Sequence, residues 1–406
     1  MNAPATSSTV RADPQSASPP LVAWALIRTL IAFDTTSRDS NLALIDWVRE
    51  YLGKLGVEST LTFDDDRRKA NLFATLPAQD GNTTSGGIVL SGHTDVVPVD
   101  GQPWTTDPFT ATVIGDKVYG RGVTDMKSFS ATGLAFVPEF LRRGLKRPVH
   151  FALSYDEEVG CIGVHRMIAD IERRGIKAGG CIVGEPTGMQ LVVAHKGKKS
   201  FRCRVRGHEA HSSLTSQGVN AVQIACEIVT YLTGMARAFR DQGSFDHAYD
   251  VPYTTVHTGT IRGGTALNIV PRDCQFDFEF RHLPFDDPDE LFAEVKAYAA
   301  RFLPEMHAIS PETFIEFQQM SALPGLDTAP DTEIARLGAE CNNVAGHGKV
   351  SFGTEAAAFH MASIPTIICG PGFIAQAHQP NEWVTLDQLA ACEAFMRRFA
   401  DRVCVS

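Results

Sequence analysis

The sequence lacks any apolar run long enough to cross a membrane, since no hydrophobic segment approaches the roughly 18–20 residues of a transmembrane helix. It also lacks an excess of basic residues: 37 lysines and arginines stand against 47 acidic residues, which gives a net charge of −10. Phosphate binding needs a basic patch, so this balance argues against nucleic acid and weakly favours neutral or cationic small ligands. We therefore expect neither a membrane nor a nucleic acid among its partners.

Paired cysteines and phosphate-binding loops are missing as well. The nine cysteines are scattered without a C-x-x-C pair, which indicates reduced thiols and not a disulfide framework. The P-loop lysine pattern is absent. Residues 1–20 are polar and rich in proline and serine, without the apolar stretch of a signal peptide, so we expect a disordered tail. Together these features predict a cytoplasmic protein.

What the sequence does contain is an alternation of short apolar runs with helical stretches. Apolar residues recur at helical spacing in "LVAWALIRTLIAF" and "SNLALIDWVREYLGKLG". Five short apolar runs read as buried strands, at residues 71–76, 87–92, 149–155, 181–184 and 365–370. Strands that alternate with helices predict an α/β fold, with a mostly parallel sheet flanked by helices.

The middle of the chain has a different pattern. Apolar and polar residues alternate in "KKSFRCRVRG" and "DCQFDFEFRHL", and long helical stretches separate or follow these segments. This predicts an inserted α+β domain at residues 195–308, within a discontinuous α/β domain formed by 21–194 and 309–406. A chain of 406 residues is long enough for two such domains.

Potential metal ligands follow four of the five strand-like runs. His93 and Asp95 follow the second run, acids 156–158 the third and Glu185 the fourth, while a Gly-Pro-Gly loop leads from the last run to His378. Ligands of open α/β folds gather outside the carboxyl ends of the strands. These side chains are therefore expected to share one crevice, although they are far apart in the sequence.

Two histidines and several carboxylates in one crevice predict a centre for two divalent metal ions. The expected ligands are His93, Asp125, Glu158, Glu185 and His378. Three carboxylates and a bridging hydroxide would balance the charge of two such ions, which matters where solvation is poor. The nitrogen and oxygen donors suit zinc, with cobalt or manganese as substitutes. Asp125, on a glycine-flanked turn, is the best candidate to bridge metals about 3.5–4 Å apart.

Asp95 and Glu157 are expected to support these ligands. A ligating imidazole needs its second ring N–H held, usually by a carboxylate, and the spacing of His93 and Asp95 supplies both groups. Glu158 can bind metal while Glu157 acts as general base and afterwards as general acid. Taken singly, an acid or a histidine is most often on the surface. The prediction therefore depends on the joint pattern of the strand ends.

Two further segments have competing interpretations. His208 and His211 precede a serine-rich turn and a helix, in a stretch that is either an ordinary exposed loop or a functional one. The segment "FGTEA", which contains Gly353, offers backbone that a ligand can approach closely, but an ordinary turn has the same composition.

The motifs together resemble those of the M20 metallopeptidases, over about residues 22–400. The resemblance is carried by "SGHTDVVP", "YGRGVTDMKSF", "DEEVGCIG", "GEPT", "GHEAHSS", "FGTEA" and "GPGFIAQAHQPNEWV". Three stretches, "SNLALIDWV", "GTALNIVP" and "QAHQPNEWV", resemble more narrowly the acetylornithine deacetylase branch.

This resemblance implies a role for each residue of the metal centre. His93 and Glu185 would bind one metal, Glu158 and His378 the other, and Asp125 would bridge them. It also implies that Glu157 is the base and that Asp95 orients His93.

The resemblance further implies a homodimer, in which the inserted domain serves dimerisation or acts as a lid. His211 of the partner subunit would stabilise the oxyanion, Asn268 and Arg281 would hold the substrate carboxylate, and Gly353 would also contact substrate. The residues "RHLP" after "FEF" fall where relatives vary, which leaves the side-chain specificity open.

The implied activity is hydrolysis of N2-acetyl-L-ornithine to L-ornithine and acetate. The metal motifs do not separate this substrate from another N-acyl amino acid, such as N-acetylcitrulline, or from a dipeptide. A metal-free binding or regulatory protein on the same fold would need broken ligands, and all five are intact.

Overall fold

A computed structural model describes residues 20–342 and 346–405. The tail expected at residues 1–20 lies, except for its last residue, outside the described part. The described chain divides into two compact units. Unit 1 contains the residues up to Val192 together with 328–347 and those from Ala358 onward, and unit 2 contains Val193–Asp327 and Gly348–Ala357.

Unit 1 is built around a mixed sheet whose centre is parallel. The strands run in the order β1 (Ser59–Phe63), β2 (Ala70–Leu76), β6 (Val149–Ser154), β3 (Ile88–His93), β7 (Gly180–Pro186), β15 (Thr366–Gly370). Strands β6, β3, β7 and β15 are mutually parallel, and β1 and β2 are antiparallel additions. Every residue of the four parallel strands is buried, as expected for a sheet covered on both faces. The predicted α/β fold class is confirmed.

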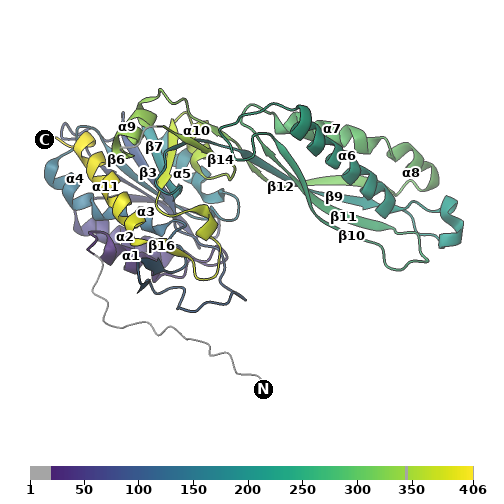
Figure 1. The fold of residues 1–406 in the computed structure, drawn as a ribbon, viewed down its shortest axis with the longest axis horizontal. Helices are drawn as coiled ribbons and strands as arrows, with labels where there is room; N and C mark the ends of the chain where they lie inside the picture. Colours follow the sequence, from purple (N-terminus) through teal and green to yellow (C-terminus); the bar gives the residue numbers. More distant parts are fainter. Residues whose placement is uncertain (1–19, 343–345, 406) are drawn as a thin grey trace, which may run out of the picture. The chain divides into compact units, whose positions relative to one another are not determined.

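Helices flank this sheet (Figure 1). They are α1 (Trp24–Ile31), α2 (Leu42–Lys54), α3 (Lys127–Ala135), α4 (Val137–Arg143), α5 (Ile162–Arg173), α9 (Glu333–Asn342) and α11 (Leu386–Val403), and α10 (Ala356–Met361) begins in unit 2 and ends in unit 1. The predicted amphipathic pattern is realised in α2, which buries Leu44, Ile45, Val48 and Leu52 along one side. Shortly after α2 the chain turns at Gly56, whose positive φ of 77° favours glycine.

A small antiparallel sheet joins two distant segments of unit 1. It consists of β4 (Thr112–Ile114), β5 (Lys117–Tyr119) and β16 (Trp383–Thr385), with β5 in the middle. The pairing of Trp383 with Tyr119 carries the segment that follows His378 onto the loop that leads to Asp125. The sheet thereby helps to bring these two predicted ligands together.

Unit 2 contains a separate antiparallel sheet with its own core. Its strands run in the order β10 (Thr255–Gly263), β11 (Asp273–His282), β9 (Gly197–Arg206), β12 (Phe314–Leu323). Helices α6 (Ala221–Gln242), α7 (Pro288–Ala300) and α8 (Leu303–Ile309) lie along it (Figure 1). Between helices and sheet, a core rich in phenylalanine includes Phe201, Phe276 and Phe280. Polar side chains alternate with this core and form the opposite face.

The inserted unit extends further than the boundary of 308 that we expected from the sequence. Strand β12 pairs with β9 from Phe314 opposite Arg206 to Leu323 opposite Lys198, so it belongs to the second sheet. Residues 348–357, including Gly353, also belong to unit 2 and not to the α/β unit. The alternating pattern of a strand does not specify which of two sheets it joins, and this accounts for the error.

The remaining short elements are β8 (Val192–His195), β13 (Leu326–Asp327), β14 (Gly348–Val350) and two 3₁₀ turns, η1 (Ser212–Gln217) and η2 (Ile374–Gln376). None of the nine cysteines, all of which lie in the described residues, forms a disulfide. Across the residues that the structure describes, no helix has both the length and the apolarity needed to span a bilayer.

Candidate metal centre

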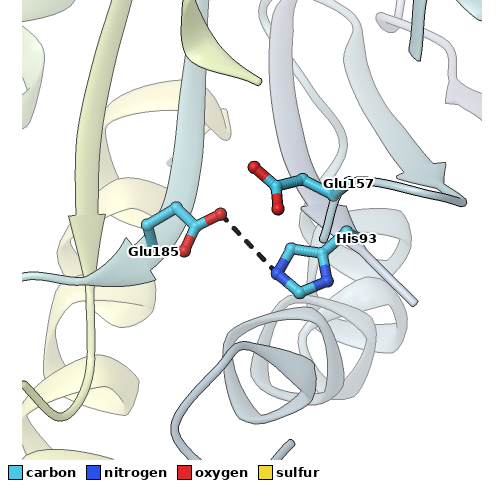
Figure 2. A group of neighbouring side chains, drawn as sticks. All are labelled: His93, Glu157 and Glu185. Atoms are coloured by element: carbon cyan, nitrogen blue, oxygen red, sulfur yellow. Dashed lines mark ion pairs between the residues drawn. The ribbon is translucent and has the colours of Figure 1, made fainter. Parts of the chain in front are cut away.

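The predicted ligands of unit 1 meet at the carboxyl edge of its parallel strands. His93 is the last residue of β3, Glu185 lies near the end of β7, and Glu157 and Glu158 follow β6. Because these strands are parallel neighbours, their ends open onto the same edge. Figure 2 shows the side chains of His93, Glu157 and Glu185 pointing toward one another from three separate segments.

Two overlapping groups of donor atoms are close enough to hold metal ions. One comprises His93, Glu157 and Glu185 and the other His93, Asp125 and Glu158, and within each group all donor atoms lie within 4.8 Å of one another. His93 Nε2 is 2.9 Å from Asp125 Oδ1 and 3.6 Å from Glu185 Oε1. The structure thus places Glu157, which we expected to act only as a base, within a possible ligand group.

Asp125 lies between the two histidines. Its Oδ1 faces His93, while its Oδ2 is 3.3 Å from Nε2 of His378, which is also 2.9 Å from Glu158 Oε2. Each oxygen of one carboxylate therefore faces a different half of the cluster. All five expected ligands are brought together, and Asp125 has the position that a bridging carboxylate requires.

The electrostatics of this cluster favour the binding of cations. Burial and the charge of Asp125 raise the pKa of Glu158, and raise that of Glu185 well above its ordinary value. Hydrogen bonds with Asp125 and Glu158 raise the pKa of His378 to about 10. Burial opposes ionisation of His93, but Asp125 and Glu185 outweigh it and raise the pKa of His93. Raised pKa values at two buried acids and at the two histidines beside them indicate that the cluster favours additional positive charge, and its nitrogen and oxygen donors suit divalent ions.

Asp95 has a further role beyond the one we expected. His93 Nδ1 is 2.9 Å from the main-chain oxygen of Asp95 but 3.7 Å from its carboxylate, so the main chain and not the carboxylate holds the ring. The carboxylate instead accepts the backbone N–H groups of Glu157 and Glu158, at 3.1 and 3.3 Å, and the hydroxyl of Ser37 at 2.7 Å. Asp95 therefore fastens the loop that carries both acids, and it holds the His93 ring by a hydrogen bond to its main-chain oxygen, with its carboxylate at ion-pair distance.

Glu382 fixes the loop that carries Asp125, a role that the sequence did not predict. Its carboxylate is almost fully buried and accepts the backbone N–H groups of Gly122, Thr124 and Asp125 at 2.8–3.1 Å. Arg121 donates to the same carboxylate at 2.8 Å. The sequence shows only an acid four residues after His378. In a polar loop, the sequence does not distinguish a buried acid from a solvent-exposed one.

Replacing Glu382 with glutamine should weaken metal binding by about 10–100-fold, the usual effect of losing a group that orients a ligand. The amide can accept some of the three N–H bonds but cannot neutralise Arg121, so the loop of Asp125 loses its anchor. Titration with zinc against a chromophoric chelator measures the change. Asp401→Asn, which removes an exposed acid, provides the control. Equal zinc affinity in Glu382→Gln and the wild type would contradict this role.

The segment that carries His378 has an unfavourable backbone conformation. His378 and Asn381 have φ values of 61° and 56°, in the left-handed region that non-glycine residues rarely adopt. Asn381 Oδ1 accepts the backbone N–H of Thr105 at 2.7 Å, which helps to hold the turn. Such a conformation costs about 1–2 kcal/mol per residue, and it is found where a side chain must be aimed at a site.

In unit 2, His211 and Asn268 lie on two loops that are hydrogen-bonded to each other. Ser212 N donates to the main-chain oxygen of Asn268 at 3.1 Å, and Val270 N donates to that of Ala210 at 2.8 Å. His211 is exposed, and its Nδ1 accepts the backbone N–H of Ser213 at 3.2 Å. A neutral imidazole that accepts at Nδ1 carries its proton on Nε2, so His211 presents a donor to its surroundings.

Arg281 lies at the opposite end of the second sheet. Asn268 precedes β11, whereas Arg281 lies eight residues beyond the start of this strand, which corresponds to about 27 Å of extended chain. Gly353 lies at the same end of the sheet as Arg281. It is next to Leu323, since a Cβ at Gly353 would come within 2.2 Å of that side chain. Leu323 and Arg281 are both paired with Lys198 of β9. One copy of this unit therefore cannot hold a single carboxylate with both Asn268 and Arg281, and this expectation is corrected.

Comparison with known proteins gives consistent matches over most of the chain. A family model described as peptidase family M20/M25/M40 matches residues 89–402, a range that includes all five expected ligands. The acetylornithine deacetylase of Yersinia pseudotuberculosis is 32% identical over 390 residues, which cover 94% of this chain and 96% of that protein. The acetylornithine deacetylase of Pectobacterium atrosepticum is 33% identical over 368 residues, or 89% and 91% of the two chains.

Solved structures share the fold at lower identity. An M20 family metallo-carboxypeptidase from Sulfolobus solfataricus has a TM-score of 0.72 at 17% identity, with 93% of this chain and 98% of that chain covered. The Bacillus subtilis YXEP protein, described as a dinuclear metal-binding peptidase of the M20 family, has a TM-score of 0.64 at 15% identity, with 93% and 97% covered. At these identities the likeness concerns the fold alone.

Proposed function

Because this chain belongs to peptidase family M20/M25/M40, we propose that it hydrolyses N2-acetyl-L-ornithine to L-ornithine and acetate. The family supports a metal-dependent hydrolase, and the choice of substrate comes from acetylornithine deacetylases that are 32–33% identical over about nine-tenths of both chains. The observation that carries the proposal is the placement of Asp125 between His93 and His378, with three further carboxylates around them.

The residues of this cluster would hold two divalent ions. His93 and Glu185 would bind one, Glu158 and His378 the other, and Asp125 would contact both through its two oxygens. When bound, such ions polarise the acyl carbonyl and lower the pKa of water toward about 7. Zinc suits the nitrogen and oxygen donors, and cobalt or manganese would substitute.

Glu157 would manage the proton of the reaction. Its carboxylate takes a proton from the attacking water and then delivers a proton to the nitrogen of the departing amine, so that amide and water become acetate and amine. Asp95 would keep Glu157 in place, because it binds the backbone N–H of that residue. The alternative, that Glu157 is a ligand, follows from its position beside His93 and Glu185.

Substrate would be held by residues of unit 2 from two copies of the chain. Arg281 would bind the α-carboxylate, and Gly353 at the same end of the unit would let the substrate approach the backbone closely. His211 of the partner subunit, with Asn268 of the partner subunit beside it, would donate from Nε2 to the oxyanion. The separation of Arg281 from His211 within one unit supports this homodimeric arrangement.

Removing metal with a chelator should abolish turnover, and adding zinc or cobalt should restore it. In the restored enzyme we expect N2-acetyl-L-ornithine to have the highest kcat/KM in a panel of N-acetyl amino acids that includes N-acetylcitrulline, with dipeptides alongside. Release of acetate or of free amine measures turnover. A panel led by a different N-acyl amino acid or by a dipeptide would reject the substrate while retaining the hydrolase, and full activity without metal would reject both.

A further inference from the structure

We infer that Glu279 is a positioning residue that holds the guanidinium of Arg281 ready for a substrate carboxylate. This inference rests on the proposed function, since it takes Arg281 as the carboxylate-binding group. Both residues lie on β11, two positions apart, and therefore on the same polar face of the second sheet.

The contact between Glu279 and Arg281 uses a particular edge of the guanidinium. Glu279 Oε1 accepts from Arg281 Nε at 3.0 Å, with 23% and 36% of the two side chains exposed. A guanidinium can bind a carboxylate through its side edge, Nε and Nη2, or through its end, Nη1 and Nη2. A carboxylate already at Nε blocks the side edge and orients the end of the group toward an incoming ligand.

Glu279 is itself fixed by groups of the neighbouring strand. Its Oε2 lies 3.5 Å from Lys198 Nζ and 3.5 Å from the hydroxyl of Ser200, both on β9. The register accounts for these contacts, because Arg281 is opposite Lys198 and Glu279 is opposite Ser200. Glu279 therefore has contacts to the neighbouring strand through Oε2 while Oε1 binds Arg281, and these contacts restrict its position.

The charges of this cluster match one substrate carboxylate. Arg281 and Lys198 contribute two positive charges and Glu279 one negative charge, which leaves one positive charge uncompensated among the three. An α-carboxylate of an N-acetyl amino acid would neutralise it. Without Glu279 the two cations would repel each other, and Arg281 would lose its fixed orientation as well.

Replacing Glu279 with alanine should raise KM for N2-acetyl-L-ornithine by about 10–100-fold, the range for losing a hydrogen bond to a charged group, with little change in kcat. Glu279→Gln retains an acceptor oxygen and should recover part of this loss. N-acetyl-1,4-diaminobutane is the same substrate without its carboxylate. For this compound the wild type and Glu279→Ala should have the same kcat/KM, because Arg281 has no carboxylate to bind.

A matched control is available on the same strand and face. Asp277 binds Arg202 through two contacts of 2.8 and 2.9 Å, and Asp277→Ala should leave KM unchanged for both substrates. In an Arg281→Ala background, Glu279→Ala should have no further effect on KM. Equal losses with both substrates, or an unchanged KM in Glu279→Ala, would overturn the inference.

The experiment also separates this inference from the proposed function. If the wild type hydrolyses a different N-acetyl amino acid best, the substrate proposal fails, and Glu279 is tested with that compound and its decarboxylated counterpart. If the wild type hydrolyses no N-acetyl amino acid, the proposed function fails and the role of Glu279 fails with it.

Discussion

Glu157→Ala is expected to lower kcat by about 10²–10⁴-fold, the contribution of a positioned general base, while the protein still binds two metal ions. The reason is that the substitution removes the group that moves the proton but leaves His93, Asp125, Glu158, Glu185 and His378 in place. Steady-state kinetics measure the first effect, and metal content after removal of excess zinc measures the second.

The adjacent acid provides the decisive comparison. Glu158→Ala removes a carboxylate oxygen that lies 2.9 Å from His378, so this variant should lose metal as well as activity. Glu157→Ala and Glu158→Ala should thus differ in the number of metal ions bound per chain, although both have lost most of their activity. If Glu157→Ala also loses an ion, then Glu157 is a ligand, as its distance to His93 and Glu185 allows, and the base must be sought elsewhere.

His211→Ala is expected to lower kcat by about 10²–10³-fold, which is typical for one oxyanion donor. If His211 acts across subunits, inactive Glu157→Ala and His211→Ala chains should complement each other. In a mixed dimer, one of the two sites would combine the intact Glu157 of one chain with the intact His211 of the other. Random exchange should then restore up to about a quarter of wild-type activity, because half of the dimers are mixed.

The neighbouring histidine serves as the control for this experiment. His208 lies on the same loop, and its backbone pairs with Val219, so His208→Ala should remain close to wild type. Subunit exchange is checked by mixing chains that carry two different tags. Confirmed exchange without recovery of activity would place His211 in the same subunit as the Glu157 that it assists.

The sequence was sufficient to predict that the side chains of the candidate metal cluster lie together, because several of them stand at or just after the ends of parallel strands. His93 and Glu185 come directly at the ends of fully buried strands, and parallel strands leave no freedom about the edge to which they point. The five predicted strands of unit 1 and its first two helices were placed correctly, since hydrophobic periodicity is a local property.

Relations that depend on register or on a single buried contact were not predictable. That the carboxylate of Asp95 accepts two backbone N–H groups, while its main-chain oxygen holds the ring of His93, depends on distances that the sequence does not contain. Glu382 lies in a polar loop without periodicity, so its burial could not be inferred. Asn268 and Arg281 are separated because the extended strand β11 lies between them, with Asn268 before its start and Arg281 near its end.

The left-handed backbone at His378 has an evolutionary consequence. Glycine occupies this region without steric penalty, so at φ 61° the fold alone would favour glycine over histidine. A descendant of this chain that no longer needed the imidazole would therefore gain stability from a single exchange at this position. Replacement of this histidine by glycine would therefore identify a descendant that no longer requires the imidazole.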